Sequence, residues 1–244
     1  MSLMTKAFNF DDYFHKYENN KAYQEELEKI IISRYPNASI EWFKEKEIQK
    51  KGIDFKIINN FQEISCDLKL ITPAKNHRYL ENISLELVSD YDLWVNTKGV
   101  HGRSWARKAD SQTNAICYAW ISDLYNKTLQ TKIILIYYSS LSHFIDNFFP
   151  RDKLHDFLAQ PQINILIKNA DSGSSMIGKF HKFKLWSHRN EKIQTQSFYY
   201  TITTPLWLPS LKEYFGKKGL TQITLLEKKN KKRNRSELKL REIL

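Results

Sequence analysis

The sequence predicts an α/β (α+β) fold in which a mixed sheet is flanked by helices. Three observations lead to this class: one amphipathic helical pattern near the start, three β-rich segments directly after it, and later strand and short-helix patterns. A chain of 244 residues with 41% apolar content can bury a substantial core. We expect a single domain over 1–226, with its core at roughly 20–140, a β-rich elaboration at 141–226, and a basic tail at 227–244.

The first helix is predicted over residues 21–34, and Pro36 stops the pattern soon afterwards. Its apolar positions fall at helical spacing: Tyr23, Leu27, Ile30 and Ile31. Two β-rich segments follow at 52–58 and 63–71. The turn residues Asn59-Asn60 between them indicate a β-hairpin.

A third strand is predicted over 82–88, because apolar residues alternate with polar ones there and Glu86 falls on the polar face. Residues 96–108 contain glycines and several basic side chains, which predicts a loop. The segment 115–122 fits either a strand or a buried helix. Turn residues at 123–127 favour its pairing as an antiparallel strand with 132–138.

Farther along the chain, 143–149 is predicted to be a short helix, 163–168 a strand, and 176–203 β-rich. In the tail, Leu238, Leu240 and Ile243 leave open whether it is a nucleic-acid-binding arm, an unstructured end, or a segment that docks on the body.

The composition favours a polyanionic partner. Lys and Arg outnumber Asp and Glu by 38 to 27, giving a net charge of +11, and nucleic acid is a commoner partner for such a charge than an anionic membrane surface. Cys66 and Cys117 lie in apolar surroundings, so a disulfide is not expected. No export signal or membrane-spanning run is recognisable, so we expect a cytoplasmic protein with no membrane partner.

The residues that indicate chemistry lie on the predicted hairpin. Alternation turns Asp67 and Lys69 to the face opposite Cys66 and Leu68, and it turns Asp54 away from its apolar neighbours in the same manner. If the two strands pair, Asp54 and Asp67 converge. Two adjacent carboxylates repel each other unless a cation or a proton lies between them. The alternative is a solvated polar face with no function.

A divalent metal at this point would suit phosphodiester hydrolysis, because carboxylate oxygens hold Mg²⁺ while the ion polarises phosphate and supplies hydroxide. Lys69 could orient the attacking water, neutralise developing charge, or act as a general base with a lowered pKa. Glu86 would complete the metal ligands if its strand lies nearby, and Mn²⁺ is expected to substitute for Mg²⁺.

The segment Gly52-Ile53-Asp54, followed on the next strand by Asp67-Leu68-Lys69, resembles the signature of the PD-(D/E)XK, or restriction-endonuclease-like, nuclease superfamily, in particular its phage and restriction members. The resemblance covers roughly 20–140. It implies a mixed sheet flanked by helices, Asp54 and Asp67 as metal ligands, a catalytic Lys69, and a further metal ligand from the first helix, for which Glu26 is best placed. Asn114 departs from the pattern, since an acid is common there, and no role is expected of it.

The function predicted is a Mg²⁺-dependent DNA endonuclease, whose symmetric homodimer would suit cleavage of both strands. Basic and aromatic side chains of the 96–108 loop are expected to contact DNA: Lys98, Arg103, Trp105, Arg107 and Lys108. The alternatives are a nucleic-acid-binding module of the same fold without catalysis, and an interaction protein whose basic tail meets acidic partners.

Overall fold

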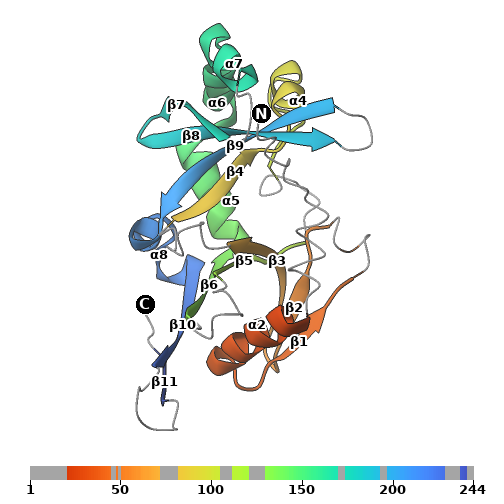
Figure 1. Ribbon diagram of the computed structural model, residues 1–244, viewed down its shortest axis with the longest axis vertical. Helices are drawn as coiled ribbons and strands as arrows, with labels where there is room; N and C mark the ends of the chain where they lie inside the picture. The colour runs from red at the N-terminus through yellow and green to blue at the C-terminus, as the bar shows by residue number, and fades with distance from the viewer. Residues whose placement is uncertain are drawn as a thin grey trace, which may run out of the picture. The chain divides into compact units, whose positions relative to one another are not determined.

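The computed structural model describes residues 21–44, 48, 51–71, 82–104, 112–120, 130–169, 174–192, 197–228 and 237–240. The chain divides into two compact units, although the sequence suggested one domain. One unit contains Asn82–Ala109 and Leu141–Ser210, and the other contains Asp11–Glu81, Asp110–Ser140 and Leu211–Leu244. We call them the four-stranded unit and the seven-stranded unit after their sheets (Figure 1).

The seven-stranded unit is a mixed sheet with the strand order β1-β2-β3-β5-β6-β10-β11. Its elements are α2 (Lys21–Arg34), β1 (Ser39–Trp42), β2 (Phe55–Ile58), β3 (Glu63–Ile71), β5 (Ala115–Trp120), β6 (Gln130–Tyr137), α8 (Leu211–Gly219), β10 (Leu220–Lys228) and β11 (Glu237–Leu240). Strands β3 and β5 pair in parallel, and all the other neighbours pair antiparallel. The predicted mixed α/β class is confirmed.

One face of this sheet is apolar because β2, β3, β5 and β6 each direct alternate side chains to it. Helix α2 contributes Leu27, Ile30 and Ile31 to the same core, as its spacing predicted. The sheet residues of the core are Phe55, Ile57, Ile64, Cys66, Leu68, Ala115, Cys117, Ala119, Ile133 and Leu135. The predicted first helix, the hairpin, and the antiparallel pairing of β5 with β6 are all confirmed.

The four-stranded unit is an antiparallel sheet with the strand order β4-β9-β8-β7. Its elements are β4 (Asn82–Val88), α4 (Tyr91–Asn96), most of α5 (Tyr138–Phe148), α6 (Arg151–Leu158), α7 (Pro161–Lys168), β7 (Ser174–Phe180), β8 (Phe183–Lys192), β9 (Ser197–Trp207) and the short 3₁₀ turn η4 (Leu208–Ser210). The predicted strand at 82–88 is therefore present, but it belongs to a sheet other than that of the hairpin.

The prediction of a strand at 163–168 is wrong, because this segment lies within helix α7. Pro161 occupies the first turn, where a missing N–H costs nothing. Ile163 and Ile167, four residues apart, are buried, whereas Ile165 is 58% exposed. The apolar residues therefore follow the helical period, and a run of six was too short to show it.

The remaining predictions concern short elements and the tail. The predicted helix at 143–149 corresponds to the end of the longer helix α5, which stops at Phe148. The β-rich region at 176–203 contains most of β7, all of β8 and part of β9. Strand β11 pairs antiparallel with β10, so this part of the tail is docked on the sheet. Among the described residues, no helix has the length and apolar character needed to cross a membrane.

Candidate metal and catalytic site

The approach to β2 is fixed by a glycine. Gly52 has a positive φ of 78°, a conformation that other residues adopt only with strain. Thr113 Oγ1 donates a hydrogen bond to the Gly52 carbonyl at 2.6 Å, and a Cβ on Gly52 would lie 2.8 Å from that oxygen of Thr113. The backbone N–H of Asp54 then donates to the carbonyl of Cys66 at 2.9 Å. These contacts determine where the Asp54 side chain begins.

Asp54 and Asp67 meet across the hairpin, as predicted. Phe55 of β2 is paired with Cys66 of β3. Asp54, directly before β2, therefore faces Asp67, directly after Cys66. Asp54 Oδ2 accepts a hydrogen bond of 2.6 Å from the backbone N–H of Leu68, and the two carboxyl side chains are hydrogen-bonded to each other. Lys69 Nζ lies 2.9 Å from Asp67 Oδ1. The structure thus brings together the three residues of the predicted centre.

These three side chains lie on the sheet face opposite the α2 core, since Phe55, Cys66 and Leu68 point into that core. Exposure differs along this face: the Asp67 side chain is 8% exposed, while that of Lys69 is 41% exposed. The interpretation as an exposed polar hairpin face therefore does not describe Asp67. Lys69 thus forms an ion pair with the buried Asp67 carboxylate while part of its own side chain stays exposed to solvent.

The electrostatics of the pair follow from this burial. Burial, followed by the charge of Asp67, raises the pKa of Asp54 to about 7, and its hydrogen bond with Asp67 acts in the same direction. The Leu68 N–H and the charge of Lys69 oppose this rise in the pKa. Asp54 therefore holds a proton below about pH 7. A divalent cation could take the place of that proton, since it supplies the positive charge that the pair lacks.

Asn114 has a role that the sequence did not indicate. Its backbone N–H donates to the Ser65 carbonyl and its Oδ1 accepts from the Ser65 N–H, both at 2.8 Å. The side chain thereby extends the parallel pairing of β3 and β5 by one position beyond Ala115. Since β2 holds the other side of β3, the strand that carries Asp67 is fixed along both edges. The only advance signal was a turn-forming residue directly before a strand.

The two further glutamates belong to other elements of the chain. Glu26 is buried on α2, 3.5 Å from Lys29, and α2 covers the opposite face of the sheet. Glu86 belongs to β4 in the four-stranded unit, where its Oε1 accepts a 2.6 Å hydrogen bond from Ser89 Oγ. Their roles as metal ligands stay predictions. Within the described part of the chain, no set of three or more Asp, Glu, His or Cys side chains is placed to hold a metal ion.

Of the residues expected to contact DNA, Lys98 and Arg103 lie in the turn that follows α4, and both have positions in the structure. Lys98 is exposed and has a positive φ of 49°. Trp105, Arg107 and Lys108 lie outside the described residues. Comparisons of the chain with protein-family models, with curated proteins and with solved structures found no match.

Proposed function

We propose that this protein is a divalent-metal-dependent endonuclease that hydrolyses phosphodiester bonds in DNA. The observation that carries the proposal is the meeting of two carboxyl groups, from adjacent strands, beside a lysine on the same face. Such a pair is costly to ionise unless a cation neutralises it, because burial and the charge of Asp67 both raise the pKa of Asp54. The net charge of +11 supports a polyanionic substrate.

Each residue has a distinct part in the proposed reaction. Asp54 and Asp67 would hold Mg²⁺, which when bound polarises the phosphate and provides hydroxide near neutral pH. The Lys69 ammonium is 2.9 Å from Asp67 and remains partly exposed, so it can reach a phosphate oxygen held at the same place. It stabilises the negative charge that develops as water attacks phosphorus. The Leu68 N–H keeps the Asp54 carboxylate oriented.

Cleavage of a long and varied DNA, such as a whole phage genome, tests this function in the presence of Mg²⁺ or Mn²⁺. The informative variants are Asp67→Asn, which keeps the shape of the side chain, and Lys69→Ala. Glu63→Gln is the matched control, because Glu63 lies on the same hairpin and is ion-paired with Lys56, away from the acid pair. We expect the wild type and the control to cleave, and both site variants to bind DNA without cleaving it.

The outcomes separate the alternatives. Cleavage by Asp67→Asn at the wild-type rate would refute the assignment of the site. If no variant cuts and all of them bind DNA with a steep salt dependence, the chain is a nucleic-acid-binding module. If the protein neither cleaves nor binds DNA, the remaining alternative is an interaction protein whose basic tail meets acidic partners.

A further inference from the structure

The turn after α4, residues 97–103, is a rigid element that we call the basic loop. Gly99 and Gly102 have positive φ values of 73° and 69°, and Lys98 also has a positive φ. A Cβ on Gly102 would overlap the carbonyl oxygen of Asp90 and lie 2.7 Å from the backbone nitrogen of Trp94. The loop therefore packs directly against the start of α4, and no larger residue fits at Gly102.

Hydrogen bonds hold both ends of the basic loop. Thr97 Oγ1 donates to the Leu93 carbonyl at 2.6 Å and accepts from the His101 N–H at 2.9 Å. At the other end, Ser89 Oγ lies 2.8 Å from the Arg103 carbonyl oxygen and 2.6 Å from Glu86 Oε1. Glu86 thus contacts Ser89, the residue whose hydroxyl also contacts the Arg103 backbone.

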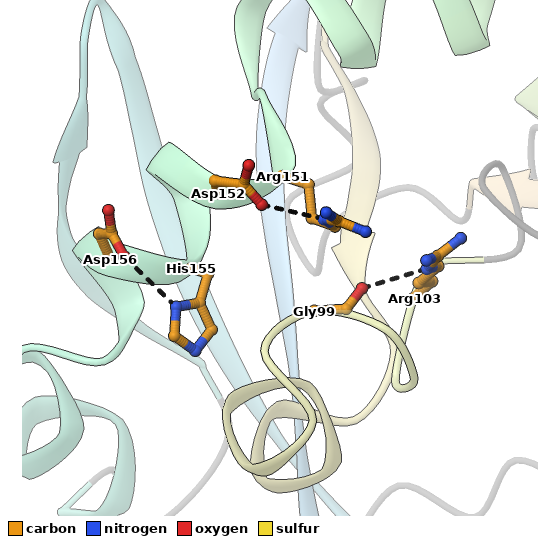
Figure 2. Close-up of polar contacts among 6 residues, drawn as sticks. All are labelled: Gly99, Arg103, Arg151, Asp152, His155 and Asp156. Atoms are coloured by element: carbon orange, nitrogen blue, oxygen red, sulfur yellow. Dashed lines mark hydrogen bonds and ion pairs between the residues drawn. The ribbon is translucent and has the colours of Figure 1, made fainter.

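Gly99 holds two arginine side chains that come from different parts of the sequence. Arg103 Nε donates to the Gly99 carbonyl at 3.1 Å. Arg151, at the start of α6, packs against Gly99 so closely that a Cβ built on this glycine would lie 2.9 Å from the Arg151 Cγ. Figure 2 shows both side chains beside Gly99. Any side chain at position 99 would displace Arg151. No pattern in the sequence associates Arg151 with this loop.

Within the described part of the chain, the hydrogen bonds of both guanidinium groups are made by Nε. Arg151 Nε donates to Asp152 Oδ1 at 3.0 Å, so in both arginines the bonded nitrogen is Nε and the two terminal nitrogens lie beyond it (Figure 2). The Arg151 side chain is 49% exposed. The bond from Arg103 Nε to the backbone of the buried Gly99 restricts the Arg103 side chain before a ligand arrives, which lowers the entropic cost of binding.

The charge around the two arginines is of both signs, because Glu86, Asp90 and Asp92 lie on the segment that precedes the loop. Lys98 and His101 are exposed on the same loop, and Lys153 is exposed on α6. Against these stand Asp152, which contacts Arg151, and Asp156, whose Oδ1 lies 3.5 Å from His155 Nδ1. The terminal nitrogens of a guanidinium fork match two oxygens of one phosphate, and adjacent forks suit a ligand that repeats its phosphates.

We propose that Arg103 and Arg151 form a two-arginine clamp for consecutive phosphates of a DNA backbone. The proposal deepens the function proposed above and rests on it, because the ligand is the substrate of that reaction. The clamp binds phosphate without reading bases, and Gly99 is the residue that both arginine side chains contact. Arg151 is thereby added to the DNA-contacting residues predicted from the sequence.

A binding titration with a fluorescently labelled duplex of about 30 base pairs, long enough to span several phosphates on each strand, tests the clamp in EDTA, so that no metal-dependent cleavage occurs. Arg151→Gln and the double variant Arg103→Gln/Arg151→Gln are compared over salt concentrations from about 50 to about 200 mM. We expect affinity to fall about tenfold for the single variant, and the slope of log K against log salt to decrease by about one for each arginine removed. Lys184→Gln is the matched control, because it removes one exposed charge from β8 of the same unit.

A second variant keeps the test independent of folding. Arg151→Lys retains the charge and loses the fork, so we expect its affinity to lie between that of the wild type and that of Arg151→Gln. Wild-type affinity and slope in the double variant would overturn the clamp, as would equal losses in Lys184→Gln. Binding to phosphatidylserine vesicles in place of DNA would also overturn it.

The two proposals fail differently. If the wild type never cleaves DNA but Arg151→Gln weakens DNA binding, the endonuclease proposal is refuted and the clamp is supported. If the wild type cleaves DNA with Mg²⁺ and the arginine variants bind DNA normally, the clamp is refuted and the endonuclease proposal is supported.

Discussion

Replacing Asp54 by asparagine should change how the stability of the protein depends on pH. The Asp54→Asn side chain keeps an oxygen for the Leu68 N–H but cannot ionise, so the variant isolates the cost of the buried charge. The pKa of Asp54 is about 7 in the folded protein against an ordinary value of 3.8. The folded state therefore holds a proton that the unfolded state has released, and wild-type stability falls as the pH rises between these two values.

The size of the effect follows from the shift. One pKa unit corresponds to about 1.36 kcal/mol, so between about pH 5 and pH 8 the wild type should lose about 2.5 kcal/mol of unfolding free energy relative to Asp54→Asn. Urea unfolding of both proteins at several pH values across this range, with EDTA present, measures this difference.

The control for this experiment is Glu63→Gln, which removes an exposed acid from the same hairpin and should follow the wild-type profile. Parallel pH profiles for the wild type and Asp54→Asn would refute the argument that the acid pair is destabilised at neutral pH. Addition of Mg²⁺ at about pH 8 should raise the wild-type unfolding midpoint and leave that of Asp54→Asn nearly unchanged, because a bound cation replaces the proton.

Three further substitutions test local contacts by urea unfolding at fixed pH. Gly52→Ala should lower the unfolding free energy by about 1–3 kcal/mol, because position 52 has a positive φ and lies close to Thr113. A smaller loss on a Thr113→Ala background would confirm the contact, and an unchanged loss would contradict it. Asn114→Ala should cost about 1–2 kcal/mol, since the Ser65 N–H loses its acceptor; Asn114→Asp, which keeps that oxygen, should cost less, and the reverse order would refute the assignment. Tyr91→Phe should cost about 1 kcal/mol through loss of the 2.9 Å hydrogen bond to the Leu158 carbonyl, and no change would show that this bond contributes nothing net.

The sequence predicted the acid pair because its evidence is local. Alternation places Asp54, Asp67 and Lys69 on one face of two strands, and the short turn between the strands fixes their pairing. The same reasoning could not place Glu86, because alternation within β4 does not say to which sheet β4 belongs.

Contacts between distant parts of the chain were beyond prediction. Arg151 lies against Gly99 only after α4 and α6 have packed, and no spacing within either segment indicates this. Asn114 was missed for the same reason, since its bond to Ser65 depends on the parallel register of β3 and β5. The segment 163–168 misled in the other direction, because six mostly apolar residues fit a strand as well as a helix until the burial of Ile163 and Ile167 is known.

The alternation of the chain between the two units has a consequence for biosynthesis. Strand β4 is synthesised early, yet among the described strands its sheet neighbour is β9, and β6 acquires its second neighbour when β10 leaves the ribosome. Neither sheet can be completed by a nascent chain that lacks the C-terminal third. Such long loop closures slow folding, and no single truncation yields either unit alone. A fragment ending before β9 should therefore expose the edge of β4 and aggregate.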